Sequence, residues 1–128
     1  MADQKEVKKW LLKAESDYLF SASILPDTTF FSQLCFFFQQ SAEKYLKAFI
    51  VKHDLNFKKI HDLIELLETC KKHDPTFSNI LEETRILNTF YIDTRYPVHW
   101  PAEVSKEEAL KALEAARKIK EFVEKLLL

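Results

Sequence analysis

The sequence contains no glycine among its 128 residues. Glycine supplies the positive φ angles of tight hairpins and the close backbone approach of phosphate-binding loops. Its absence therefore argues against P-loop and dinucleotide-binding folds. No segment shows the alternating pattern of a β-strand either, so the chain is expected to be helical.

An excess of charge of one sign and a cluster of cysteines are also missing. The formal net charge is −1, so no overall positive field draws the chain to nucleic acid, and such binding needs a local patch. Cys35 and Cys70 lie far apart within helical patterns and have no partners at metal-ligand spacing. We expect both to be small core residues in a reducing compartment, without a disulfide.

Long uncharged runs are absent as well. None approaches the length of a membrane span, and the charged start of the chain lacks the apolar region of a signal peptide. The composition, 47% hydrophobic and 30% charged, is that of a globular protein. These features predict a cytoplasmic protein without membrane contact, in which residues 1–128 form a single domain.

The helical signal is strongest from Phe30 to His53. On a helix, the apolar residues of this stretch cover about half of the circumference, which is too wide for one partner helix, so neighbours are expected on two or three sides. The apolar residues are Phe31, Leu34, Cys35, Phe37, Phe38, Ala42, Tyr45, Leu46, Ala48 and Phe49. The opposite, polar face carries Gln33, Gln39, Gln40, Glu43, Lys44 and Lys47.

Phe36 lies in the middle of this polar face. Two interpretations stay open, a ring partly covered by lysine stems and a contact between subunits. Under the second, Phe36 and the neighbouring Gln40 are the candidate interface residues.

Capping signals place the other helices. Asp3, followed by Glu6, starts a first helix that ends at Pro26-Asp27, and a third amphipathic helix is expected from Ile60 to Lys71. Asp74-Pro75 starts a fourth, whose period continues to Tyr91.

A capping box of Ser105 with Glu108 starts the last helix. Its inward face is predicted to be Ala109, Leu110, Leu113, Ala116, Ile119, Val123 and Leu126. Together the five segments predict an all-α protein, an antiparallel four- to five-helix up-and-down bundle in which sequential helices are neighbours.

Three of the four histidines, His53, His61 and His73, directly precede an aspartate. No two histidines are spaced three or four residues apart on one helix, and each pair falls at a predicted helix end. The pairs are therefore interpreted as helix caps, and no metal or cofactor is expected.

The chemically richest stretch is 93–101, whose two prolines exclude a regular helix. The fork of Arg95 suits contact with a phosphate, and His99 can exchange a proton near neutral pH. Tyr96 and Trp100 can stack on bases, so the set suits RNA phosphodiester chemistry. In the structural alternative, Arg95 pairs with Asp93 or a helix C-terminus and the aromatic rings close the end of the bundle.

The sequence resembles the HEPN domain family. The most specific matches are the Gln39-Gln40 and Glu43-Lys44 block on the long helix and the Arg95-Tyr96-Pro97 stretch. Weaker matches complete the pattern in the expected order, namely Trp10, Ala14, Asp17, Tyr18, His61, Leu63, Leu66 or Leu67, and Tyr91.

The resemblance implies a helical bundle that is usually a homodimer and often acts with a minimal nucleotidyltransferase as a toxin–antitoxin pair. Many members are metal-independent ribonucleases with an arginine followed, after four to six residues, by a histidine. Arg95 and His99 match these positions, with only Tyr96, Pro97 and Val98 between them, and Pro101 stands where some toxins have a modifiable tyrosine.

Other family members bind nucleotides or serve as interaction modules. Two hypotheses therefore stay open. The first is a ribonuclease toxin that uses Arg95 and His99, with Tyr96 and Trp100 in contact with the RNA. The second is a non-catalytic dimeric module that binds a nucleotide or a nucleotidyltransferase, in which Arg95 is an anion contact. The near-neutral charge favours the second, and the family pattern favours the first.

Overall fold

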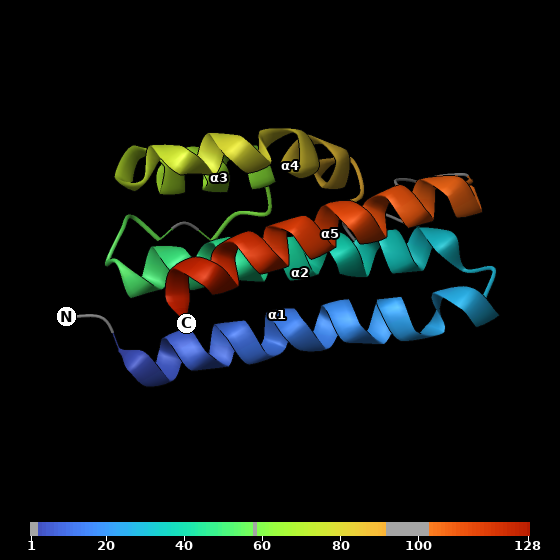
Figure 1. Ribbon diagram of the computed structural model, residues 1–128, viewed down its shortest axis with the longest axis horizontal. Helices are drawn as coiled ribbons and strands as arrows, with labels where there is room; N and C mark the ends of the chain where they lie inside the picture. Colours follow the sequence, from blue (N-terminus) through green and yellow to red (C-terminus); the bar gives the residue numbers. More distant parts are fainter. Residues whose placement is uncertain (1–2, 58, 92–102) are drawn as a thin grey trace.

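The computed structural model describes residues 3–57, 59–91 and 103–128. Three long helices, α1 (Gln4–Ile24), α2 (Phe31–Lys52) and α5 (Lys106–Leu127), lie along the long axis (Figure 1). Helix α1 runs antiparallel to α2, and α5 runs parallel to α2. Two shorter helices, α3 (Leu63–His73) and α4 (Leu81–Asn88), form a further layer. The described residues contain five α-helices and no strand, so the predicted all-α bundle is confirmed.

Helix α2 is the centre of the bundle. It packs against α1, α3, α4 and α5, which confirms that its wide apolar face needs several neighbours. Large side chains from α2 lie fully buried together with residues of the surrounding helices. The largest are Tyr45, Phe38, Phe77, Leu34, Leu46, Ile50, Leu63, Leu66, Leu67, Leu87 and Ile119.

Two predicted helix starts are confirmed, and a third differs. The carboxylate of Asp3 accepts a hydrogen bond from the backbone N–H of Lys5, and Ser105 with Glu108 forms the complete capping box. Helix α3, in contrast, starts at Leu63 rather than at Ile60, because the side chain of Asp62 accepts from the first free N–H groups of the helix. The capping interpretation of Asp62 was therefore a better guide to this helix start than apolar periodicity.

The end of α2 shows how a chain without glycine makes a position that usually requires it. Asp54 has φ +52°, the left-handed conformation that usually selects glycine after a helix. The N–H of Leu55 bonds the carbonyl of Ile50 at 2.9 Å, and that of Asp54 bonds Val51 at 3.2 Å. These two bonds are the Schellman pattern, and aspartate tolerates its left-handed residue better than most side chains do.

The fourth and last helices differ from their predictions in detail. Asp74-Pro75 does start a helical segment, but it is a 3₁₀ helix, η2 (Pro75–Ile80), and α4 follows it and ends at Asn88, before Tyr91. The other 3₁₀ segment, η1 (Leu25–Asp27), follows α1.

On α5, Leu110 and Leu126 are 45% and 40% exposed, so their predicted inward placement was wrong. Ala112 and Ala115, whose side chains are small, are buried on α5 in their place.

Both cysteines are buried free thiols, as predicted for core residues. Burial raises the pKa of Cys35 and of Cys70 to about 12, so both stay protonated at neutral pH. The thiol of Cys70 lies 3.6 Å from the backbone carbonyl of Leu46. Neither cysteine is therefore a nucleophile.

Within the described ranges, none of the helices is long and apolar enough to cross a bilayer.

The ends of α2 and α3 meet through two histidines. The rings of His53 and His73 are 4.4 Å apart, and His53 also contacts Phe49. Burial lowers the pKa of His53, the positive charges of His73 and Lys52 lower it further, and Asp74 and Asp54 partly oppose them. Protonation of His53 is therefore less favourable in the folded chain than in the unfolded chain.

This arrangement predicts a pH dependence of stability. The pKa of His53 in the folded chain lies below its unfolded value of about 6.5. The stability that neutral His53 contributes to the fold is therefore complete above about pH 6.5 and is lost as the pH falls through the folded pKa. Denaturant unfolding between about pH 7.5 and pH 5 should show this loss, and His53→Phe should reduce it. An equal loss in parent and variant would contradict the assignment.

Candidate functional site

The four residues predicted to act on RNA, Arg95, Tyr96, His99 and Trp100, lie outside the described residues. The structure does describe Tyr91, directly before residues 92–102. It also describes the surface of α2 that the sequence analysis assigned to a polar face. The candidate site is therefore built from α2 and from the segments that meet at Tyr91.

A buried polar stripe runs along α2, formed by Gln39, Glu43 and Lys47. Their spacing of four residues places them on one face of the helix, and they are 0%, 4% and 5% exposed. Charged side chains are rarely this buried unless they are paired. The polar face of α2 is therefore largely a buried contact surface, which corrects the sequence-based division into a core face and a polar outer face.

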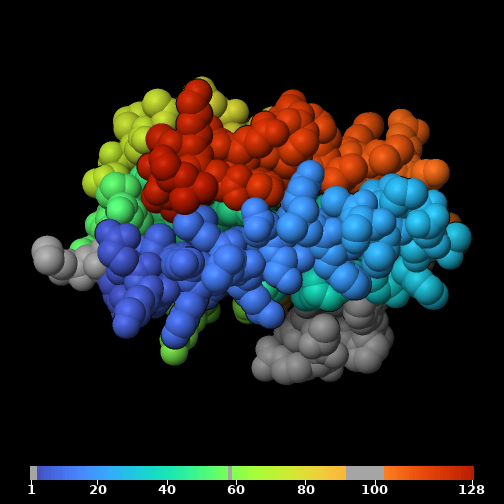
Figure 2. All heavy atoms as spheres, turned by 60° about the horizontal axis from the view of Figure 1, so that its bottom comes forward, coloured from blue at the N-terminus to red at the C-terminus, as the bar shows by residue number. Residues whose placement is uncertain are grey.

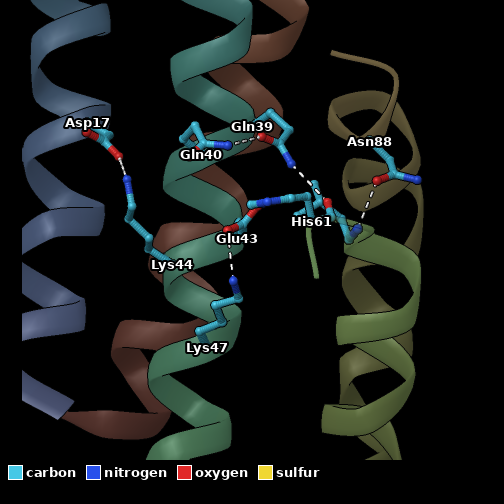
Figure 3. A network of polar contacts seen from close by, with 9 residues as sticks. Asp17, Gln39, Gln40, Glu43, Lys44, Lys47, His61 and Asn88 are labelled. Carbon is cyan, nitrogen blue, oxygen red and sulfur yellow. Dashed lines mark hydrogen bonds and ion pairs between the residues drawn. The ribbon is translucent and has the colours of Figure 1, made fainter. Parts of the chain in front are cut away.

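Glu43 is the centre of this stripe. One carboxylate oxygen lies 2.9 Å from Nζ of Lys47 on the same helix, and the other lies 3.0 Å from Nδ1 of His61 (Figure 3). Both oxygens thus have a partner, one on α2 and one in the connection that precedes α3.

Lys47 has two aromatic partners besides Glu43. Its ammonium nitrogen lies 5.7 Å from the ring centroid of Trp10 on α1 and 5.7 Å from that of Phe57 in the connection after α2. The two rings are in turn 5.8 Å apart. A cation over ring faces is attracted by their electron density, so these rings compensate part of the cost of burying the charge.

The backbone around His61 is fixed from two sides. Gln39 donates its side-chain amide to the carbonyl oxygen of His61 at 3.2 Å, and the amide of Gln40 donates to the oxygen of Gln39 at 2.8 Å. From α4, Asn88 accepts the backbone N–H of Leu63 at 2.8 Å. The start of α3 is thus tied to both α2 and α4 (Figure 3).

The ring of His61 also packs on Tyr91. The two ring centroids are 4.5 Å apart and the planes differ by only 12°, so the rings are stacked. The side chain of His61 is 48% exposed, whereas the Glu43 carboxylate that it contacts is buried. His61 is therefore an accessible imidazole held between a buried carboxylate and the residue from which segment 92–102 departs.

A separate ion pair links α1 to α2. Lys44 bonds the carboxylate of Asp17, and both side chains are mostly buried (Figure 3). Lys44 was assigned to the polar face, and here this face also turns out to be an interhelical contact.

The two candidate interface residues occupy the same region of α2. Phe36 is half-buried. Its ring packs edge-on against the ring of Phe37, and the two ring centroids are 5.7 Å apart. Gln40 is half-buried and donates to Gln39 within the chain. These contacts leave part of both side chains accessible, and a subunit contact through them stays a prediction.

The three histidine–aspartate pairs act in two different ways. Asp62 and Asp74 cap the helical segments that follow them, as predicted, but Asp54 takes the left-handed position after α2. In the part of the chain that the structure describes, no three His, Cys, Asp or Glu side chains are grouped closely enough to hold a metal ion.

Sequence reasoning did not find the contacts among Gln39, Glu43, Lys47 and His61. Two signals were available. Glu43 precedes Lys47 by four residues, the favourable order for an ion pair on a helix, and His61 was one of the matches to the HEPN pattern. Neither signal revealed that the pair is buried under Trp10 and Phe57.

The five helices and the buried contacts of Glu43 and Lys47 define the class of protein: an all-α bundle with an ion pair buried between its helices. The family model of the HEPN domain matches residues 7–126. The chain therefore belongs to the HEPN domain family.

Two solved structures are similar over nearly the whole chain. The crystal structure of TT1696 from Thermus thermophilus has 28% identity and a TM-score of 0.79, covering 93% of this chain and 96% of that one. ST0689, an archaeal HEPN homologue, has 23% identity and a TM-score of 0.75, covering 95% and 98%, and shows likeness of fold alone. No curated protein matches the sequence.

Proposed function

We propose that the chain is a metal-independent ribonuclease and the toxin component of a toxin–antitoxin pair. The observation that carries the proposal is the stack of Tyr91 on His61, itself held by buried Glu43. Tyr91, the last described residue before the segment that contains Arg95 and His99, thus packs on a side chain that a buried carboxylate holds.

In this proposal, Arg95 contacts the scissile phosphate through its planar fork and stabilises the charge that develops there. His99 acts as a general acid or base in the attack of the 2′-hydroxyl. Tyr96 and Trp100 stack on neighbouring bases. These assignments use residue chemistry and family membership, since the four residues lie outside the described ranges.

The test is cleavage of a mixed single-stranded RNA by purified protein, with and without EDTA. We expect cleavage at the same rate in both conditions, because no step of the proposed chemistry uses a metal ion. Loss of activity in EDTA would contradict the metal-independent mechanism. No cleavage in either condition would contradict the ribonuclease itself.

A second candidate is a non-catalytic module that binds a nucleotide or a nucleotidyltransferase. Two observations favour it, the net charge of −1 and the three residues between Arg95 and His99, where the family pattern has at least four. This candidate predicts saturable binding of a nucleotide, weakened by Arg95→Ala, without RNA cleavage. Calorimetric titration beside the cleavage assay separates the two candidates.

The proposed antitoxin is a minimal nucleotidyltransferase, as family membership suggests. Growth of a host that expresses the chain alone or together with such a partner tests this role. Arrest that the partner relieves would support the pair, and unimpaired growth with the chain alone would contradict it.

We further propose a homodimer that uses Phe36. Its ring contacts Phe37, and the ring of Phe37 lies 5.3 Å from that of Phe20 on α1. Phe20 is exposed together with Leu12 and Leu19, so exposed apolar side chains continue from α2 onto α1. Helix α1 lies along the face of the molecule that Figure 2 presents. Aromatic and aliphatic surface of this kind marks interaction sites.

A stable dimer should bury more than about 1,000 Å² in total. We expect light scattering to show a dimer for the parent and a monomer for Phe36→Glu, because the new charge would be buried without a partner. A parent that stays monomeric at high micromolar concentration would contradict the dimer. An intact dimer of the variant would exclude Phe36 from its interface.

A further inference from the structure

The charge of the chain is unevenly distributed along the sequence. Residues 3–13, at the start of α1, and residues 55–60, in the connection after α2, together contain six lysines and two acidic residues. These two segments therefore have a formal net charge of +4, and the rest of the chain has −5. The net charge of −1 thus combines a basic region with an acidic remainder.

The two basic segments meet in the fold. Helix α1 begins beside the end of α2 (Figure 1), and the ring centroid of Trp10 on α1 lies 5.8 Å from that of Phe57 in the connection. Lys47, which contacts both rings, is paired with Glu43 and so adds no net charge to this region. The two segments therefore form one basic surface around the two rings.

Three exposed lysines flank these rings. On α1, Lys13 follows Trp10 by three residues, which makes the two side chains neighbours, and Lys9 precedes Lys13 by four on the same edge of the helix. Lys59 is two residues after Phe57. None of the three lysines forms an ion pair within residues 3–57, 59–91 and 103–128, so their ammonium groups can contact an external anion.

The rings themselves are partly open to solvent. Phe57 is 38% exposed, and Trp10 is half-buried. The buried ammonium of Lys47 lies 5.7 Å from each ring centroid and attracts both rings from the inner side. Because the rings are already held in place, they lose little freedom when a ligand packs on them, and the cost of binding is lower.

We infer that this basic surface binds single-stranded RNA. It consists of Lys9, Trp10, Lys13, Phe57 and Lys59. The inference rests on the proposed ribonuclease function and names how its substrate is held. The lysines contact phosphates, and unpaired bases stack on the two rings. Aromatic rings among lysines favour RNA over an acidic protein, which offers carboxylates to the lysines but no bases to the rings.

The experiment measures binding of the full-length protein to a fluorescein-labelled single-stranded RNA in which every ribose is 2′-O-methylated. This RNA lacks the attacking hydroxyl, so binding is measured apart from cleavage. We expect fluorescence anisotropy to show saturable binding. The triple variant Lys9→Ala, Lys13→Ala, Lys59→Ala should bind more weakly. It should also lower the slope of log affinity against log salt by about 2, since each phosphate contact on a single strand contributes about 0.7.

Stacking is tested at Phe57. Phe57→Leu keeps an apolar side chain but removes the ring, so it should weaken binding about 5–150-fold at unchanged salt slope, the effect of one lost base stack. Phe30→Leu is its control, because Phe30 is 67% exposed at the other end of α2. The control for the lysines is the triple variant Lys106→Ala, Lys111→Ala, Lys118→Ala on α5. Both controls should keep the parent salt slope, and all variants should keep parent helicity by circular dichroism.

The fluorescence of Trp10 reports on stacking directly. The chain has two tryptophans, so in Trp100→Phe the emission comes from Trp10 alone. Saturating 2′-O-methylated RNA should quench this emission, because a base stacks on the indole. Poly-glutamate, which carries negative charge but no bases, should leave the emission unchanged.

The surface and the ribonuclease fail in different ways. Parent affinity for RNA in either the lysine variant or Phe57→Leu would overturn the surface, even where unmodified RNA is cleaved. Equal binding of poly-glutamate and RNA without quenching of Trp10 would overturn it in favour of an acidic protein partner. The predicted binding without cleavage of unmodified RNA would support the surface and overturn the ribonuclease. Neither binding nor cleavage by the parent would overturn both.

Discussion

Replacement of Lys47 by alanine is expected to lower the free energy of unfolding by about 3–5 kcal/mol. The carboxylate of Glu43 lies 2.9 Å from the ammonium of Lys47, and both side chains are about 5% exposed. The substitution leaves this buried carboxylate without its ammonium partner, and it removes the cation that contacts the rings of Trp10 and Phe57. The loss should appear in denaturant unfolding as a lower midpoint at unchanged slope.

The chain offers a matched control for this prediction. Glu107 and Lys111 form the same four-residue pair on α5 at 4.0 Å, but their side chains are 83% and 68% exposed. Exposed pairs contribute about 0–1 kcal/mol, so Lys111→Ala should have little effect. The double variant Glu43→Leu with Lys47→Leu should lose less than Lys47→Ala alone, because it leaves neither charge of the pair behind. Equal losses for Lys47→Ala and Lys111→Ala would contradict the buried ion pair.

Replacement of His99 by alanine is expected to lower the rate of RNA cleavage by about 10²–10⁴-fold, the usual size of general acid–base assistance. Arg95→Ala should be similarly damaging. Its guanidinium would be lost from the phosphate contact and from the charge that develops during in-line attack. Initial rates on one RNA substrate at saturating concentration measure both effects.

Two controls show whether these losses are chemical. Helicity by circular dichroism and mass by light scattering should be the same in the parent and both variants, because neither residue belongs to any of the five α-helices. Cleavage that survives His99→Ala but not Arg95→Ala would assign that proton transfer to another group, and Tyr96 would be the next position to change.

Helical periodicity predicted the bundle because it depends on local spacing. The apolar residues of α2 recur at three- and four-residue steps, and the capping residues Asp3 and Ser105 mark where backbone N–H groups need partners. These signals act within a few residues and survive folding. Periodicity failed where a local cap determined the helix start. Asp62 caps α3, which begins at Leu63, three residues later than periodicity predicted.

The polar side of α2 could not be predicted in the same way. Polarity alone places Gln39, Glu43 and Lys47 in solvent, and they are buried only because partners distant in sequence satisfy them. Those partners are Trp10 on α1 and His61 before α3. Which distant residue reaches a buried charge depends on how the helices pack, and periodicity within one helix contains no information on that packing.

The ends of the RNA fragments test the central claim most directly. Purified parent should cleave a defined single-stranded RNA in EDTA and leave 2′,3′-cyclic phosphate and 5′-hydroxyl ends, because the 2′-hydroxyl is the attacking group. The Arg95→Ala, His99→Ala double variant, prepared in parallel, should leave the RNA intact. Intact RNA with the parent, the same fragments with the double variant, or fragments with 3′-hydroxyl and 5′-phosphate ends would contradict a ribonuclease that uses these two residues.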